Sequence, residues 1–204
     1  MCIRDSAPPA PPTADLVELQ SRARAQGLAV QKPWLRLGHY RATLSGHESE
    51  ADGASFFLAP TGKDDPAAEL DATLAALLAP PVHDGTHARC RFPARFAYLA
   101  SALSLDVAQL PPVACPKYED FLKRLAPRSV TLVFSSYYVN NPASAFGHTF
   151  LRFNKEPGKR GERHELLDYG VDYAGVVDTN NALLYGLKGL TGLFEGRFNH
   201  YPYY

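Results

Sequence analysis

The hydrophobic pattern divides the chain into a first part with helical spacing and a second part with strand spacing. Before Pro127, apolar residues recur three or four positions apart, as in the stripe of leucines at 70, 74, 77 and 78. After it, the apolar runs are continuous or alternating and rich in Val, Phe and Tyr. We therefore expect an α+β domain, with helices from 13–127 packed on an antiparallel sheet of 130–139, 147–153 and 165–173.

Start and stop signals place the individual elements. Asp15 is the N-cap of a helix that runs to about Ala29. Asp65 and Pro66 begin a second helix, because a carboxylate caps well and proline suits the first helical position. Two further helices are expected over 90–103 and 116–125, a polar loop over 45–54, a short helix over 179–190 and an extended segment over 197–204.

The segment SVTLVFSSYYVNNPASAFGHTFLRFN, residues 129–154, predicts a strand, a tight polar loop and a second strand. His148 begins the second strand, beside Gly147 and a loop of small residues. An imidazole held there, next to open backbone, suits a general base. The alternative is a histidine packed in the core with one hydrogen-bond partner, and spacing alone favours that alternative.

Composition excludes several classes of function. The 204 residues include 46% hydrophobic and 21% charged positions, which is ordinary for a globular protein. Twenty-one basic residues balance twenty-one acidic ones, so no basic surplus indicates nucleic acid or an anionic membrane surface as partner. No stretch approaches the roughly 18–20 apolar residues of a transmembrane helix.

Both ends of the chain indicate a fragment. The leader MCIRDS lacks the basic start and apolar run of a secretory signal, and we interpret it as a sequencing artefact. Residues 7–12 are a Pro/Ala linker, which holds neither helix nor sheet. The last residues, RFNHYPYY, suggest a strand cut within its pattern. We expect residues 1–12 to lie outside the fold and one domain to span 13–204.

The motif NNPASAFGHTFLRF resembles the signature of the Lnb N-terminal periplasmic domain family of bacteria, long described as a domain of unknown function. Five other segments, three before this motif and two after it, occur in the family's order: WLRLGHY (34–40), DPAAELDATLAALL (65–78), CRFPARFAYL (90–99), LLDYGVDYA (166–174) and YGLKGLTGLFEGRF (185–198). The resemblance covers most of the chain. It implies a periplasmic or cell-envelope location and a fold similar to circularly permuted papain-like thiol enzymes.

The resemblance also implies a chemistry, because the best-described members of the family transfer acyl chains onto bacterial lipoproteins. His148 is then the base, and Asp172, in preference to Asp168, orients its imidazole. A symmetric hairpin would place His148 opposite about Gly170, with the two aspartates flanking it. Ser144 and Asn141 are candidates to shape the pocket or donate to an oxyanion. The implied partners are a lipoprotein or phospholipid acyl donor and a membrane attached through segments outside this chain; no cofactor is implied.

The nucleophile is the missing part of this scheme. The family's cysteine follows its histidine, whereas no cysteine follows Cys115 here. Either the nucleophile was lost by truncation, which we favour and which would leave this chain inactive, or Cys90 or Cys115 acts instead. Cys90 precedes a proline-led helix that could lower its pKa. We predict instead that Cys90 and Cys115 are a structural pair, which could form a disulfide in the oxidising compartment that the resemblance implies.

The chain has other interpretations besides the acyltransferase. The chain could be a thiol hydrolase related to the acyltransferases, or a non-catalytic module that docks a lipoprotein or cell-wall ligand. Arg91 and Arg95 could together hold a carboxylate or lipid phosphate, although a solvated face or an internal salt bridge is the favoured role. His83 and His87 have ligand-like spacing, yet with Cys90 they would still lack a fourth zinc ligand, so no metal is predicted.

Overall fold

The computed structural model describes residues 15–82, 85–135, 148–156, 168–176 and 178–202. It divides into two compact units, Met1–Pro116 and Lys117–Tyr204, where the sequence led us to expect a single domain over 13–204. We refer to them as the N-terminal unit and the C-terminal unit and describe each by itself.

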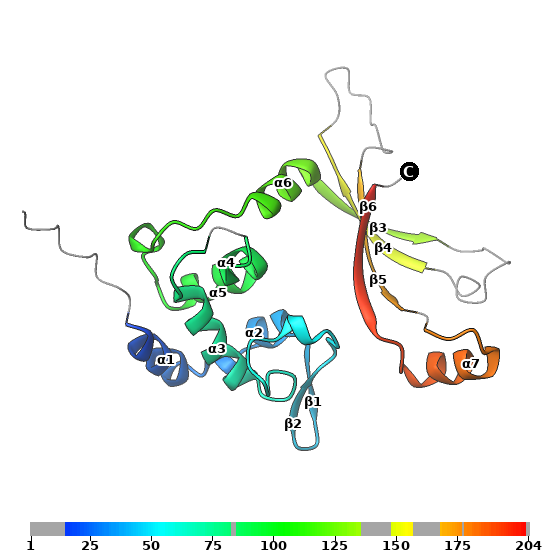
Figure 1. The fold of residues 1–204 in the computed structure, drawn as a ribbon, viewed down its shortest axis with the longest axis horizontal. Coiled ribbons are helices and arrows are strands. Elements are labelled where there is room, and N and C mark those ends of the chain that lie inside the picture. The colour runs from blue at the N-terminus through cyan, green and yellow to red at the C-terminus, as the bar shows by residue number, and fades with distance from the viewer. Residues whose placement is uncertain (1–14, 83–84, 136–147, 157–167, 177, 203–204) are drawn as a thin grey trace, which may run out of the picture. The chain divides into compact units, whose positions relative to one another are not determined.

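The N-terminal unit is mainly helical (Figure 1). Its helices are α1 (Leu16–Ala25), α2 (Lys32–Leu37), α3 (Pro66–Leu78), α4 (Ala88–Arg91) and α5 (Pro93–Ala102). Three 3₁₀ turns, η1 (Leu28–Val30), η2 (Ala54–Phe56) and η3 (Val107–Gln109), connect them. A small hairpin of β1 (Tyr40–Thr43) and β2 (Gly46–Ser49) lies between α2 and η2.

Local signals set the ends of these helices. The carboxylate of Asp15 accepts from the backbone of Val17, and that of Asp65 accepts from two amides in the first turn of α3, so both predicted N-caps are confirmed. The helix predicted over 90–103 is broken in two at Phe92. Phe92 has φ −127° and ψ 55°, because the residue before a proline, here Pro93, avoids helical backbone.

A leucine-rich core holds the N-terminal unit together. Ten buried apolar residues form one cluster: Leu19, Ala23, Leu28, Trp34, Leu70, Leu74, Leu77, Ala88, Leu99 and Leu103. Trp34 is 1% exposed, and its indole Nε1 donates to the carbonyl of Pro66 at 2.9 Å. This bond ties α2 to the start of α3 and satisfies the one polar atom of a buried indole.

The polar loop predicted over 45–54 is partly wrong, because its first residues form β2. Ser49 pairs with Tyr40 and is only 2% exposed. Its hydroxyl donates to the carbonyl of Gly38 at 2.6 Å, and its amide donates to the carbonyl of Lys63 at 2.8 Å. A serine whose polar atoms are satisfied in this way can be buried, and sequence polarity alone does not reveal it.

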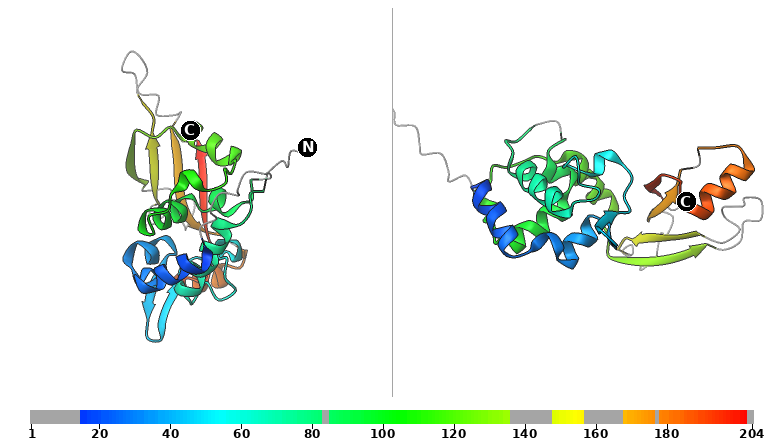
Figure 2. Two further views of the ribbon diagram at one scale, coloured as in Figure 1. Left: turned by 90° about the vertical axis from the view of Figure 1, so that its left-hand side faces the viewer. Right: turned by 90° about the horizontal axis from the view of Figure 1, so that it is seen from below.

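The C-terminal unit is a four-stranded antiparallel sheet with two helices (Figure 1). Its elements are α6 (Pro116–Leu125), β3 (Ser129–Ser135), β4 (His148–Asn154), β5 (Tyr169–Gly175), α7 (Ala182–Thr191) and β6 (Gly196–Pro202). The strands lie side by side in the order β3-β4-β5-β6, as the turned views in Figure 2 show. The predicted α+β class is confirmed. The packing of the helices before Pro116 on the sheet stays a prediction.

The strand register sorts the side chains of the sheet onto two different faces. One face, which we call the apolar face, carries Val130, Leu132 and Phe134 of β3, Leu151 and Phe153 of β4, Tyr169, Val171 and Tyr173 of β5, and Phe198 and His200 of β6. The other, the polar face, includes Thr131, Arg152, Asn154, Gly170 and Asp172. Helix α6 packs on one end of the apolar face, since the Phe121 ring contacts the rings of Tyr169 and His200.

Candidate functional site

The backbone of His148 begins β4, as the sequence predicted, and pairs with Ser135 of β3. The preceding loop, with the candidate residues Ser144 and Asn141, lies outside the described residues, as does the side chain of His148. Alternation along β4 assigns position 148 to the polar face, together with positions 152 and 154.

The register predicted between β4 and β5 is wrong by four residues. Gly170 lies opposite Arg152, not His148, and the described β4–β5 pairs end at Leu151 and Val171. The hairpin is symmetric, but β5 begins at Tyr169, four residues later than the predicted start at Glu165, and this displaces every pair by four residues. Since a slip by an even number of residues keeps the face, the two aspartates still belong to the same face as position 148.

Asp168 anchors the connection between β4 and β5. It is 5% exposed, and its Oδ1 accepts from the backbone amide of Lys155 at 2.9 Å. Its Oδ2 lies 3.7 Å from Nε of Arg152, and that Nε also donates to the side chain of Asn154. These contacts give Asp168 a structural role at the start of β5.

Asp172 occupies the next position but one beyond Gly170 on the same face. Its side chain is buried, and its backbone pairs with Asn199 of β6. A buried carboxylate on a strand is held rigidly enough to orient a neighbouring imidazole. The assignment of Asp172 as the partner of His148 stays a prediction, since it depends on a side chain outside the described residues.

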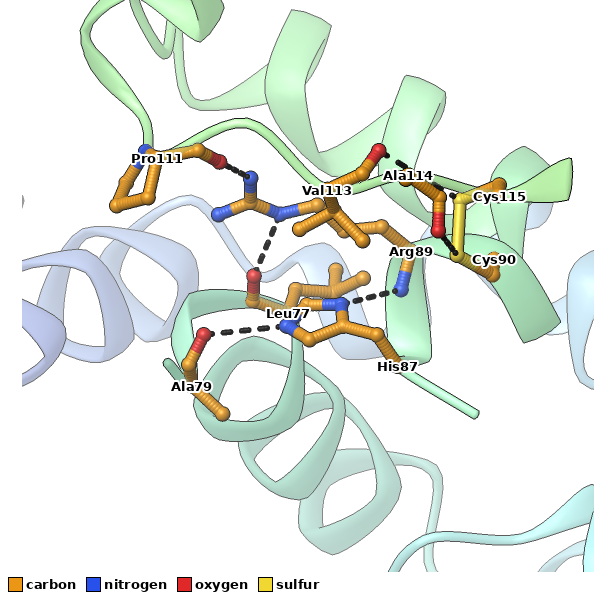
Figure 3. Close-up of a disulfide and its surroundings, with 9 residues drawn as sticks. All are labelled: Leu77, Ala79, His87, Arg89, Cys90, Pro111, Val113, Ala114 and Cys115. Atoms are coloured by element: carbon orange, nitrogen blue, oxygen red, sulfur yellow. Dashed lines mark hydrogen bonds between the residues drawn. A yellow bond between two sulfur atoms is a disulfide. The ribbon is translucent and has the colours of Figure 1, made fainter. Parts of the chain in front are cut away.

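Cys90 and Cys115 form a disulfide 25 positions apart, with their Cα atoms 5.2 Å from each other (Figure 3). The predicted structural pair is therefore confirmed. It removes the alternative in which either thiol is the nucleophile, because a sulfur in a disulfide carries no ionisable thiol. The bond joins the end of α4 to the segment that leads into α6.

The side chain of His87, the residue directly before α4, interacts with backbone groups near this disulfide (Figure 3). Its Nδ1 accepts from the amide of Arg89 at 3.1 Å, and its Nε2 lies 3.1 Å from the carbonyl of Ala79. The guanidinium of Arg89 donates to the carbonyls of Leu77 and Pro111, and burial lowers its pKa. His87 therefore acts as a helix cap, and its partner in the metal alternative, His83, lies outside the described residues.

Arg95 makes an internal salt bridge with Glu69, the favoured reading of this arginine. Its Nη1 lies 2.5 Å from Oε1 of Glu69, and the two side chains are 3% and 0% exposed. The amides of Leu58 and Ala59 donate to the same carboxylate, so both oxygens of Glu69 accept hydrogen bonds. Burial lowers the pKa of Arg95, and Glu69 partly offsets this.

Arg91 does not join Arg95 in holding an anion. Its Nη2 donates to the carbonyl of Ser55 at 2.6 Å, and its guanidinium stacks on Phe92. The neighbouring hydroxyl of Tyr40 donates to the carbonyl of Gly62, and burial, followed by the charge of Glu69, raises the pKa of Tyr40 far above its ordinary value. The network around Glu69 and Arg95 is thus structural.

Sequence reasoning did not identify Glu69 as the partner of Arg95, and it missed the ion pair of Asp168 with Arg152. Glu69 offered one signal, since it sits among the leucines and alanines of a helix that the pattern predicts to be packed. Among the described residues, no group of three or more His, Cys, Asp or Glu side chains is placed to hold a metal ion. No helix in the described ranges is long and apolar enough to cross a bilayer.

The comparisons with protein families follow the division into two units. Residues 26–102 match a domain of unknown function (DUF7843), and residues 117–204 match the Lnb N-terminal periplasmic domain. The segments 34–40, 65–78 and 90–99, which the resemblance assigned to the Lnb domain, therefore fall in the other family. No curated protein and no solved structure matches the sequence. Residues 117–204 are thus similar to the Lnb N-terminal periplasmic domain, and this match indicates a location in the periplasm or cell envelope.

Proposed function

We propose that the C-terminal unit supplies the histidine of a thiol acyl transfer in the bacterial envelope. The observation that carries the proposal is the backbone position of His148 at the start of β4, on the same face of the sheet as the buried Asp172. The match of residues 117–204 to the Lnb N-terminal periplasmic domain supports an envelope role.

In this proposal His148 takes the proton of a cysteine thiol supplied by polypeptide outside this chain. The thiolate attacks the ester carbonyl of a phospholipid, the ester C–O bond breaks, and the alcohol leaves with the proton from His148. An amine of a lipoprotein then attacks the thioester, loses a proton to His148 and releases the thiol. Asp172 holds the imidazole in one orientation throughout.

The test is His148→Ala in the complete reading frame. We expect acyl transfer from a labelled phospholipid to a lipoprotein peptide to fall by on the order of 100-fold or more, the usual worth of a general base. Folding should be little affected, because His148 is the first residue of β4. The matched control is His47→Ala in the β1–β2 hairpin, which should keep full activity. Normal turnover by a folded His148→Ala protein would refute the assignment.

A second function is favoured by the disulfide, because both cysteines in the described part of the chain are consumed by it. On this alternative the unit is a non-catalytic module that docks a lipoprotein or cell-wall ligand in the envelope. It predicts that the complete protein binds a lipoprotein peptide or a peptidoglycan fragment with no acyl transfer, and that His148→Ala leaves both properties unchanged.

A further inference from the structure

The apolar face of the sheet exposes large hydrophobic side chains on all four strands. Their exposed fractions are 53% for Val130, 68% for Leu132, 62% for Phe134, 41% for Leu151, 48% for Tyr173 and 60% for Phe198. Helix α6 contacts the end of this face at Tyr169 and His200. Single exposed apolar residues are common, but a face of six that share one side of a sheet marks an interaction surface.

Helix α7 carries a second exposed apolar surface, which we call the leucine stripe. Leu183, Leu187 and Leu190 follow at helical spacing and are 85%, 57% and 90% exposed. Other residues attach the helix: the ring of Tyr185 contacts that of Phe194, and Lys188 Nζ binds Asp178 at 2.6 Å. A Cβ on Gly175 of β5 would lie 3.1 Å from Phe194, so this ring sits against the end of the strand. The stripe itself stays exposed.

We propose that a second copy of this chain covers both surfaces, with the leucine stripe of each copy packed on the apolar face of the other. The two surfaces are complementary, since a helix with an apolar stripe is the usual cover for an apolar sheet face. The contact of Phe121 shows that this face already accepts one helix. Exchange of the same contact in both directions closes a two-fold dimer and leaves no open end for further growth.

The exposed area is sufficient for a stable dimer. The six residues of the apolar face and the three of the leucine stripe each expose on the order of 100 Å², which gives on the order of 1,000 Å² per copy. A standard interface buries about 800 Å² per partner. None of the nine residues carries a charge at neutral pH, so the association should depend little on salt.

The experiment measures mass by sedimentation and native mass spectrometry on the oxidised chain, from about 1 to 100 µM, the range where standard interfaces are populated. We expect a dimer whose dissociation constant rises at least about tenfold in Leu132→Asp, which charges the sheet, and in Leu187→Glu, which charges the stripe. Both positions are exposed in the single copy, so circular dichroism should remain unchanged. The control Leu44→Asp, at a fully exposed leucine of the β1–β2 hairpin, should dimerise normally.

Mixing the two variants distinguishes this arrangement from others. Leu132→Asp retains an intact stripe and Leu187→Glu an intact sheet face, so the mixture should form a mixed-mass dimer with one undamaged contact and one that carries both changes. The second change falls in a contact that the first has already weakened and should cost less there, so the mixed dimer should be tighter than either variant alone. A wild-type chain that stays monomeric at every concentration would overturn the proposal. So would a dimer that only Leu132→Asp weakens, which would indicate contact between two sheet faces, or one that neither variant weakens.

Discussion

The two units bury different kinds of side chain. Of the buried hydrophobic residues in the described part of the chain, all but Leu125 lie in the N-terminal unit. In the C-terminal unit the buried side chains include Asp168 and Asp172, while most of the large apolar ones are exposed. The N-terminal unit thus closes its own core, whereas the sheet of the C-terminal unit still offers apolar area to a partner.

The largest expected effect comes from breaking the buried pair of the N-terminal unit. Arg95→Met should lower its free energy of unfolding by about 3–5 kcal/mol, because Glu69 would remain buried without its cation. The fluorescence of Trp34, the only tryptophan, follows this unit alone in a urea titration. The matched control is Arg24→Met, whose ion pair with Asp71 is exposed and should contribute about 1 kcal/mol or less. Equal midpoints for both variants would contradict the role of the pair.

Removal of the disulfide should have the next largest effect. Cys90→Ala with Cys115→Ala should destabilise the N-terminal unit by about 3 kcal/mol, because a link between residues 25 positions apart restricts the unfolded chain. Amide hydrogen exchange of β3–β6 should not change, since both cysteines belong to the other unit. Faster exchange in the sheet would show that the two units unfold together.

A smaller effect is expected at Gly196, on the apolar face of the C-terminal unit. The hydroxyl end of Tyr173 occupies the place of a Cβ at this position, so Gly196→Ala must turn Tyr173 away from Phe198. We expect a loss of about 1 kcal/mol by hydrogen exchange of β5 and β6. Gly186→Ala in α7 is the control: its Cβ meets no atom within 4 Å, and it should stabilise the helix slightly.

The smallest effect concerns the attachment of α7. The hydrogen bond from Lys188 lowers the pKa of Asp178 below its ordinary value of 3.8. Because the folded-state pKa is depressed, the stabilisation is present above the unfolded pKa and is lost as the pH falls through the folded one. The carboxyl ¹³C shift of Asp178 should titrate below 3.8, and Lys188→Met should return the midpoint toward that value. An unchanged midpoint would refute the contact.

Local signals in the sequence predicted much of the fold. Asp15, Asp65 and Pro66 act within one turn of the helix that they begin, so their effect can be read from neighbouring residues. The change of hydrophobic period near Pro127 predicted the change from helices to sheet. Helix caps and hydrophobic spacing depend on residues a few positions apart, so they can be recognised without knowing how the rest of the chain folds.

The register of the sheet and the choice of ion-pair partners could not be predicted. The residue opposite Gly170 depends on where β4 ends and where β5 begins. The hydrophobic alternation does not fix these ends, because a slip of two or four residues leaves every side chain on the same face. Arg95 could equally have faced solvent, and only the packing of α3 against α5 brings Glu69 to it. The candidate site was predicted at the level of strand and face, with His148, Asp168 and Asp172 on one side of the sheet.

The position of the disulfide has a consequence for the order in which the protein matures. Both of its cysteines and the whole leucine-rich core lie within the first 116 residues, and every strand pair of the larger sheet lies after them. A chain that enters the envelope from its N-terminus can therefore fold and oxidise this unit while the sheet is still in transit. The sheet, with its exposed apolar face, then folds after the disulfide of the N-terminal unit has formed.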